Sequence, residues 1–186
     1  MSNLTEKQRG FHLQKMRTRY YRLDLNNDGF ISREDFEIIA TKLQEYSKLD
    51  KEKSEQIRNA FRFVAETAGL KPGVKIPIEE AAKIANKEYL SMTPEQQQAT
   101  VKMLGPVFEA LDFNNDGHIS REEFKWYFQT LAPDLSDADV THSFNVIDSN
   151  KNGEISREEF FAAAFDFYYG VEETEISKVF FGPLMS

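Results

Sequence analysis

One feature constrains this chain more than any other: an oxygen-rich segment occurs three times without gaps. The copies are RLDLNNDGFISREDF (22–36), ALDFNNDGHISREEF (110–124) and VIDSNKNGEISREEF (146–160), and each contains Ile-Ser-Arg-Glu. Such internal repeats indicate repeated structural units. Their first aspartates, Asp24, Asp112 and Asp148, lie 88 and then 36 residues apart. The shorter spacing suits two adjacent helix-loop-helix units, and the longer spacing leaves room for one more.

A fourth unit is predicted at residues 69–80, GLKPGVKIPIEE, where Ile76 takes the place of the repeated isoleucine. Its ligand positions lack carboxylates except at the end of the loop. They hold Gly69, Lys71, Gly73 and Glu80, with Lys75 beside them. We expect a unit that keeps its structural role and binds no metal, and we call it the silent loop.

The other three segments suit calcium, which takes about six to eight oxygen ligands from positions 1, 3, 5, 7, 9 and 12 of a 12-residue loop. In loop 112–123 the expected ligands are Asp112, Asn114, Asp116, the His118 carbonyl, Ser120 and Glu123. In loop 148–159 they are Asp148, Asn150, Asn152, the Glu154 carbonyl, Ser156 and Glu159. Only two of the side-chain ligands in loop 148–159 are carboxylates, so Coulomb attraction for a cation is weaker there. Preorganisation could reverse that ranking.

The first loop, 24–35, differs from the other two at its last position. Its expected ligands are Asp24, Asn26, Asp28, the Phe30 carbonyl, Ser32 and Asp35. Aspartate is one methylene shorter than the glutamate of the usual pattern. A smaller shell with one carboxylate oxygen from Asp35 would suit magnesium, which prefers shorter bonds. We therefore predict a mixed calcium/magnesium site at this loop.

Composition excludes several other classes of protein. The 186 residues include no cysteine, so a metal must be held by oxygen or by histidine nitrogen. The net charge is −8 and the 23 lysines and arginines are scattered, which argues against a nucleic-acid partner. The apolar stretch 160–171 is too short to span a membrane, and the N-terminus MSNLTEKQRG lacks the apolar run of a signal peptide. We expect a cytoplasmic monomer.

The chain carries no recognisable catalytic constellation. His12, His118 and His142 lie far apart, and no serine, cysteine or acidic partner joins them in the sequence. We therefore expect a binding protein and not an enzyme.

Helical signals flank the loops. Thr93-Pro94-Glu95-Gln96 has the pattern of a capping box with proline at the first helical position. Gly105-Pro106 interrupts the apolar periodicity that follows, which predicts a kink or break. The last apolar segment, 176–184, is expected to dock on the body of the protein.

The whole chain resembles the sarcoplasmic calcium-binding proteins of the EF-hand class and their relatives, the coelenterazine-binding (luciferin-binding) proteins and the calcium-regulated photoproteins. The silent loop and the Phe-Gly-Pro-Leu run at 181–184 are similar to the first group. The segments KMRTR (15–19), GFISRED (29–35), GLKPGV (69–74) and EEAA (79–82) look more like the second. The photoproteins fit poorly, because their cavity uses His, Trp and Tyr groups and a C-terminal proline. This chain has one tryptophan, Trp126, and ends in Leu-Met-Ser.

The resemblance implies a compact all-α fold of four EF-hands in two pairs, residues 1–91 and 92–186. Short β-bridges would join the paired loops, with Ile31 facing Ile76 and Ile119 facing Ile155. The resemblance also implies that coelenterazine lies in the apolar interior between the pairs. Calcium binding would then favour its release to a luciferase.

Two other functions stay open, a cytosolic calcium/magnesium buffer without a small-molecule ligand and a calcium sensor that binds a protein target. Sensors open to expose a methionine-rich groove, but the chain has 5 methionines against 16 phenylalanines and 7 tyrosines. Stiff aromatic residues favour a closed body. They suit either a packed core or an apolar ligand cavity, and because both face inward at the same helical spacing, no cavity residue is assigned.

Overall fold

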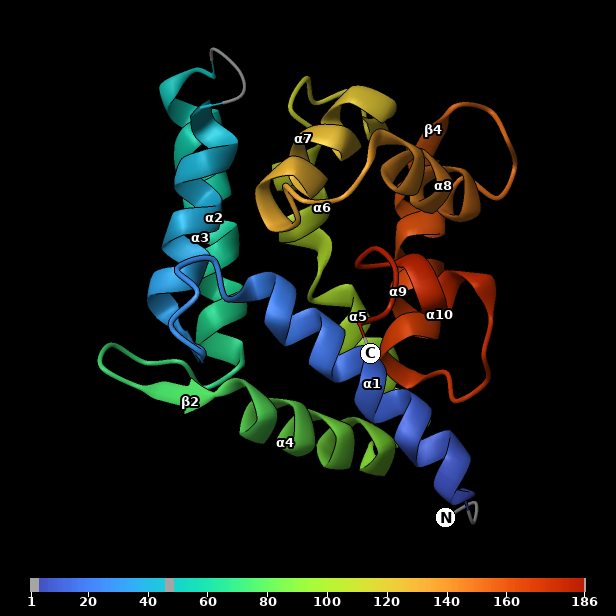
Figure 1. Cartoon of the computed structure of the whole chain (residues 1–186). Coiled ribbons are helices and arrows are strands. Elements are labelled where there is room, and N and C mark those ends of the chain that lie inside the picture. Colours follow the sequence, from blue (N-terminus) through green and yellow to red (C-terminus); the bar gives the residue numbers. More distant parts are fainter. Residues whose placement is uncertain (1–3, 46–48, 186) are drawn as a thin grey trace.

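Figure 1 shows the chain as a computed structural model that describes residues 4–45 and 49–185. The outer ends of the two predicted halves, Met1 and Ser186, lie outside the described residues. The helices are α1 (Glu6–Leu23), α2 (Arg33–Glu45), α3 (Lys51–Thr67), α4 (Ile78–Ser91), α5 (Pro94–Lys102), α6 (Gly105–Leu111), α7 (Arg121–Leu131), α8 (Asp137–Ile147), α9 (Arg157–Tyr169) and α10 (Glu175–Val179). The strands are β1 (Phe30–Ser32), β2 (Lys75–Pro77), β3 (His118–Ser120) and β4 (Glu154–Ser156).

The strands join the four loops in two antiparallel pairs, β1 with β2 and β3 with β4. The register places Ile31 opposite Ile76 and Ile119 opposite Ile155. Side chains at such opposite positions pack against each other, and Ile31, Ile119 and Ile155 are almost fully buried. The prediction of a mostly helical fold with two short bridges between paired loops is therefore confirmed.

The predicted signals around residue 100 correspond to helix boundaries. The Thr93 hydroxyl accepts from the backbone of Gln96, and the Gln96 side chain accepts from the backbone of Thr93, so the capping box forms at the start of α5. α5 ends at Lys102, and α6 begins at Gly105. The chain thus breaks at Gly105-Pro106 as predicted.

The helices enclose one continuous apolar core that includes residues of both halves. In Figure 1, α1 crosses the middle of the molecule above α4, and α2 and α3 lie side by side. The first half meets the second through α3 against α6, α2 against α7, and α1 and α4 against α9. Among the helices of residues 4–45 and 49–185, none has the length and apolar character needed to cross a membrane.

The C-terminal segment packs against the body. α10 contacts α8 and α9, and the Phe180 and Phe181 side chains behind it are buried. Gly182 has φ of 79°, and a Cβ there would lie 2.5 Å from Leu135 Cδ1, so only glycine fits this turn. The backbone N–H of Met185 donates to the Thr18 hydroxyl of α1 at 3.0 Å. The end of the chain therefore ties α1 to the second half.

Two buried polar side chains strengthen the contact between α1 and α9. Lys15 Nζ donates to the carbonyls of Asp166 and Gly170 at 3.2 and 2.7 Å. His12 Nε2 lies 2.8 Å from the Tyr168 carbonyl, and its Nδ1 lies 3.0 Å from the Asn86 amide nitrogen. Because a carbonyl only accepts, Nε2 carries the proton and Nδ1 accepts, so the neutral ring satisfies both partners.

Protonation of His12 is expected to destabilise this fold. Burial, with a smaller contribution from the nearby Lys15, lowers the pKa of His12 to about 4, although the hydrogen bond to the Tyr168 carbonyl opposes the change. Between this value and the unfolded value, the unfolded chain binds the proton and the folded chain does not. The free energy of unfolding should therefore fall by roughly 3 kcal/mol between about pH 7 and about pH 4 because of this group.

The measurement is denaturant unfolding of the wild type and of His12→Gln across that pH range. Glutamine can still donate to the Tyr168 carbonyl but does not titrate. The difference in free energy of unfolding between the two proteins should shrink as the pH falls. If both free energies fall in parallel, His12 is not the group responsible.

Candidate metal loops and interior cavity

The first aspartate of each predicted metal loop is held in the same way. Asp112 Oδ1 accepts from the backbone N–H of Asp116 at 3.1 Å, and Oδ2 accepts from Gly117 at 2.9 Å. Asp24 and Asp148 make the equivalent pair of hydrogen bonds in their own loops. The backbone can wrap around the carboxylate because the fourth and sixth positions are left-handed, as at Asn115 and Gly117 with φ of 57° and 89°.

The acidic residue at the twelfth position spans each loop. Glu123 Oε1 accepts from the backbone N–H of Phe113 at 2.8 Å and of Asn114 at 3.2 Å, while Oε2 accepts from the backbone and hydroxyl of Ser120, both at 2.8 Å. Glu123 thereby joins the second, third and ninth positions and also caps α7. Glu159 spans loop 148–159 in a similar way, but at the second position its Oε1 accepts from the Ser149 hydroxyl and not from a backbone N–H.

Asp35 spans the first loop although it is one methylene shorter. Its Oδ1 accepts from the backbone N–H of Leu25 at 3.1 Å, and its Oδ2 accepts from the backbone of Ser32 at 2.9 Å. The Asp35 side chain is fully buried, and burial raises its pKa against the effect of these hydrogen bonds. The start of α2 therefore lies close enough for aspartate to close the loop.

The silent loop differs from its partner in charge and in contacts. Its turn is held by backbone hydrogen bonds such as Val74 N–H to the Lys71 carbonyl at 3.0 Å, and Glu80 is exposed to solvent. Across the β1–β2 bridge, Lys75 Nζ lies 2.6 Å from Asp28 Oδ2. The silent loop thus places an ammonium group on a predicted ligand of loop 24–35.

The donor chemistry of the three metal loops fits a hard cation. Within residues 4–45 and 49–185, no three His, Cys, Asp or Glu side chains are gathered as a metal cluster. Each loop instead alternates carboxylates with amide, hydroxyl and backbone oxygens. Each Asp112 oxygen accepts one N–H and keeps a second lone pair, whereas each Glu123 oxygen accepts two hydrogen bonds that a bound cation would replace. An all-oxygen set of this kind suits calcium or magnesium.

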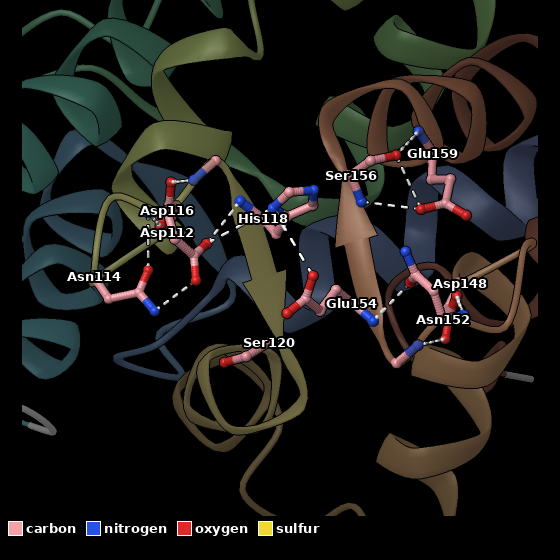
Figure 2. Close-up of polar contacts among 12 residues, drawn as sticks. Asp112, Asn114, Asp116, His118, Ser120, Asp148, Asn152, Glu154, Ser156 and Glu159 are labelled. Carbon is pink, nitrogen blue, oxygen red and sulfur yellow. Dashed lines mark hydrogen bonds and ion pairs between the residues drawn. The ribbon is translucent and has the colours of Figure 1, made fainter.

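Figure 2 shows the predicted loops 112–123 and 148–159 side by side across the β3–β4 bridge. The His118 ring lies between them, with Nδ1 3.9 Å from both Asp116 Oδ1 and Glu154 Oε2. This ring is partly exposed. The two carboxylates near it belong to Asp116 in the same loop and to Glu154 in the paired loop. Of the three histidines, only His12 is buried.

A cavity of about 430 Å³ lies between the two halves. Its walls come from α1, α3, the silent loop and α4 on one side, and from α5, the turn after α5 and α9 on the other. Pockets of this size and largely apolar character are typical of small-molecule sites. The lining includes the aromatic residues Tyr20, Tyr89 and Tyr168 and the apolar residues Val64, Ala85 and Leu104.

Arg19 places a positive charge at the wall of this cavity. Its residue exposure is 5%, and its guanidinium donates to the hydroxyls of Tyr20 and Tyr89 at 3.2 and 3.3 Å. It also lies over the Tyr20 and Tyr168 rings, at 4.8 and 5.1 Å from their centroids. Arg19 Nε is buried without a hydrogen-bond partner. Such a donor is costly to bury.

Comparisons with known proteins agree with this architecture. A model of the EF-hand domain pair matches residues 101–165, and an EF-hand model matches residues 21–40. The luciferin-binding protein of Renilla reniformis is 42% identical over 182 residues, which cover 98% of this chain and 99% of that protein. The chain belongs to this EF-hand calcium-binding family. This EF-hand protein is also 36% identical to the sarcoplasmic calcium-binding protein of Perinereis vancaurica tetradentata, over 93% of this chain and 98% of that one.

Solved structures show the same fold for this EF-hand protein. The crystal structure of the coelenterazine-binding protein from Renilla muelleri, in its calcium-loaded apo form, superposes with a TM-score of 0.90. That protein is 44% identical, and the match covers 97% of this chain and 100% of that one. N-aequorin has a TM-score of 0.70 at 20% identity and shares the fold alone. The family assignment made from the sequence is confirmed.

Three charged residues near these sites were not identified from sequence periodicity as functional: Arg19, Lys53 and Lys75. Only the packing of the helices brings Arg19 to Tyr89 and Lys53 to the Glu109 carbonyl. Lys75 stands beside the silent ligand positions, and only the β1–β2 register brings it to Asp28.

Replacing Lys75 with glutamine is expected to raise the calcium affinity of loop 24–35. The substitution removes a cation that competes for Asp28. Because the ion pair is solvent-exposed, the gain should be modest, about two- to fivefold. Calorimetry on the full chain measures it, with Lys71→Gln as a control in the same loop. Equal effects of the two substitutions would show that only the overall charge matters.

Proposed function

We propose that this EF-hand protein is a non-enzymatic carrier that binds coelenterazine and releases it when calcium binds. The observation that carries the proposal is the cavity between the halves, which is lined by three tyrosines and by the buried Arg19. The similarity to a luciferin-binding protein over nearly the whole chain supports the choice of ligand.

The cavity wall suits a polar aromatic ligand. The Tyr89 and Tyr168 rings meet edge to face at 5.5 Å, which leaves ring faces and edges for stacking with another aromatic system. Burial opposes the charge of Arg19, but the surrounding phenol groups hold its pKa above the ordinary value. A permanently charged donor in an apolar wall would orient the acceptor atoms of the ligand.

The three predicted loops are the proposed calcium sites. The proposed ligands are the eighteen groups given by the sequence in loops 24–35, 112–123 and 148–159, with magnesium competing at loop 24–35 because of Asp35. In every loop both oxygens of the first aspartate already accept from the loop backbone. The last acid of each loop also accepts from the loop and would exchange some of these hydrogen bonds for the cation.

Metal and ligand would be linked through the helices that they share. α1 leads into loop 24–35 and carries Arg19, and α9 leaves loop 148–159 and carries Tyr168. Calcium weakens the binding of coelenterazine only if the ligand prefers the calcium-free arrangement, and the effect is then reciprocal. In this proposal the two pairs of hands, 1–91 and 92–186, form the walls of the cavity. The protein acts as a cytoplasmic monomer that passes its ligand to a luciferase.

A calcium/magnesium buffer is the second candidate, because a sarcoplasmic calcium-binding protein is 36% identical over most of the chain. It differs from the carrier in requiring no small-molecule ligand. Calcium-dependent capture of a protein target without coelenterazine binding would instead indicate a sensor.

Coelenterazine titration of the purified full chain distinguishes these functions. In the absence of calcium, absorbance should reveal one saturable site, and added calcium should lower its affinity. The absence of saturable binding would leave the buffer. Binding that calcium does not alter would contradict calcium-triggered release.

Arg19→Met tests the proposed ligand contact. Methionine keeps most of the volume but removes the buried donor, so coelenterazine affinity should fall roughly 10- to 100-fold. Arg9→Met is the matched control, because Arg9 lies on the same helix and is exposed. Circular dichroism and thermal unfolding check that both variants fold. Equal coelenterazine affinities in the two variants would show that Arg19 does not contact the ligand.

A reciprocal exchange tests the metal preference of loop 24–35. Asp35→Glu should weaken magnesium competition at this loop, because the longer side chain can provide both carboxylate oxygens to the larger ion. Glu123→Asp should introduce magnesium competition at loop 112–123. Calcium calorimetry with and without magnesium measures both effects. Unchanged competition in both variants would disprove the role assigned to side-chain length.

A further inference from the structure

A lysine of the first half is buried against a metal loop of the second half. Lys53 lies in the first turn of α3 and is only 4% exposed. Its Nζ donates to the Glu109 carbonyl at 2.5 Å, to the Asp112 carbonyl and to Asn115 Oδ1 at 2.8 Å. An ammonium group has three N–H donors, so all three are used within the stretch 109–115.

The partners of Lys53 are available because of how loop 112–123 closes. In a continuing helix, the Glu109 carbonyl would accept from the N–H of Phe113. That N–H donates instead to Glu123 Oε1 at 2.8 Å, so the carbonyl at the end of α6 needs another donor. A cation is favoured at a helix C-terminus, and Lys53 provides it from the other half of the molecule.

The charge of the buried Lys53 is compensated in part by two predicted metal ligands. Burial lowers the pKa of Lys53, while the carboxylates of Asp112 and Glu123 raise it, followed by those of Glu109 and Asp50. A divalent cation in loop 112–123 would take over the charge of Asp112 and Glu123. The buried ammonium would then lose its compensation and face a second positive charge.

The same elements form the wall of the cavity. α3 meets α6 in the contact that Lys53 anchors, and the far end of α3 contributes Val64 and Thr67 to the cavity. Leu104, immediately before α6, lines it from the opposite side. A change in the α3–α6 contact is therefore transmitted to both walls.

We propose that the Lys53 ammonium is an internal competitor of the cation in loop 112–123, and that it couples occupancy of this loop to the α3–α6 contact and the cavity. The inference rests on the proposed function, because it takes loop 112–123 as a calcium site. By reciprocity, Lys53 lowers calcium affinity at this loop, and calcium weakens the Lys53 contact.

Trp126 offers a local measurement. It is the only tryptophan of the chain, lies on α7 directly after loop 112–123, and packs against Phe113 with ring centroids 5.4 Å apart. Its fluorescence during calcium titration of the full chain reports this loop. The response should disappear in Glu123→Gln, and a wild type without any response would overturn the proposed site itself.

Lys53→Met is expected to raise calcium affinity at this loop on the order of tenfold, because it removes the competing charge. A purely structural role predicts the opposite sign, since losing the cap of α6 would loosen the loop and weaken binding. Lys51→Met is the matched control, because Lys51 lies in the same turn and is exposed. Lys53→Gln provides a second neutral variant that can still donate to a carbonyl if methionine prevents folding.

The link to the cavity has a separate measurement. The factor by which calcium weakens coelenterazine binding should be smaller in Lys53→Met than in the wild type or Lys51→Met. Unchanged or lower calcium affinity in both neutral variants overturns the competitor role while leaving the calcium site intact. If calcium affinity rises but calcium weakens coelenterazine binding by the same factor as in the wild type, the coupling to the cavity is overturned.

Discussion

The hydrogen bonds that cross each metal loop from its twelfth residue are the interaction on which the rest of this structure depends. One carboxylate at the start of the exiting helix accepts from the beginning of the loop and from its ninth position. It thereby fixes the loop, caps the helix and sets where that helix leaves. Because the β-bridge joins loops two by two, the directions of four helices in each half follow from a few local contacts.

Closing the loops has consequences elsewhere in the chain. Once Glu123 takes the N–H of Phe113, the end of α6 has an unpaired carbonyl, which becomes an acceptor for Lys53. The metal loop and the contact between the halves therefore share the same backbone groups. In the first half, the bridge between loop 24–35 and the silent loop has a different effect, since it brings Lys75 onto Asp28.

Buried positive charges distinguish the interior of this protein from a simple apolar core. Lys15, Arg19 and Lys53 are each almost fully buried, and each joins helices that are distant in the sequence. Lys15 joins α1 to α9, Arg19 joins α1 to α4, and Lys53 joins α3 to α6. Burying an ion is unfavourable without partners, so these contacts require particular helix positions.

The sequence by itself determined the four loops and their order, because each set of loop positions lies within twelve consecutive residues, and it predicts that the second loop binds no metal. It also predicted the partners Ile31–Ile76 and Ile119–Ile155 through family resemblance, and the break at Gly105 through proline chemistry. Only the tertiary structure decided which tyrosines meet Arg19, where the cavity lies and what Lys53 contacts. Core-facing and cavity-facing residues have the same helical periodicity, and the contacts of Arg19 with Tyr89 and of Lys53 with Glu109 join residues 70 and 56 positions apart. No local pattern encodes such pairs, since they arise only when the helices pack.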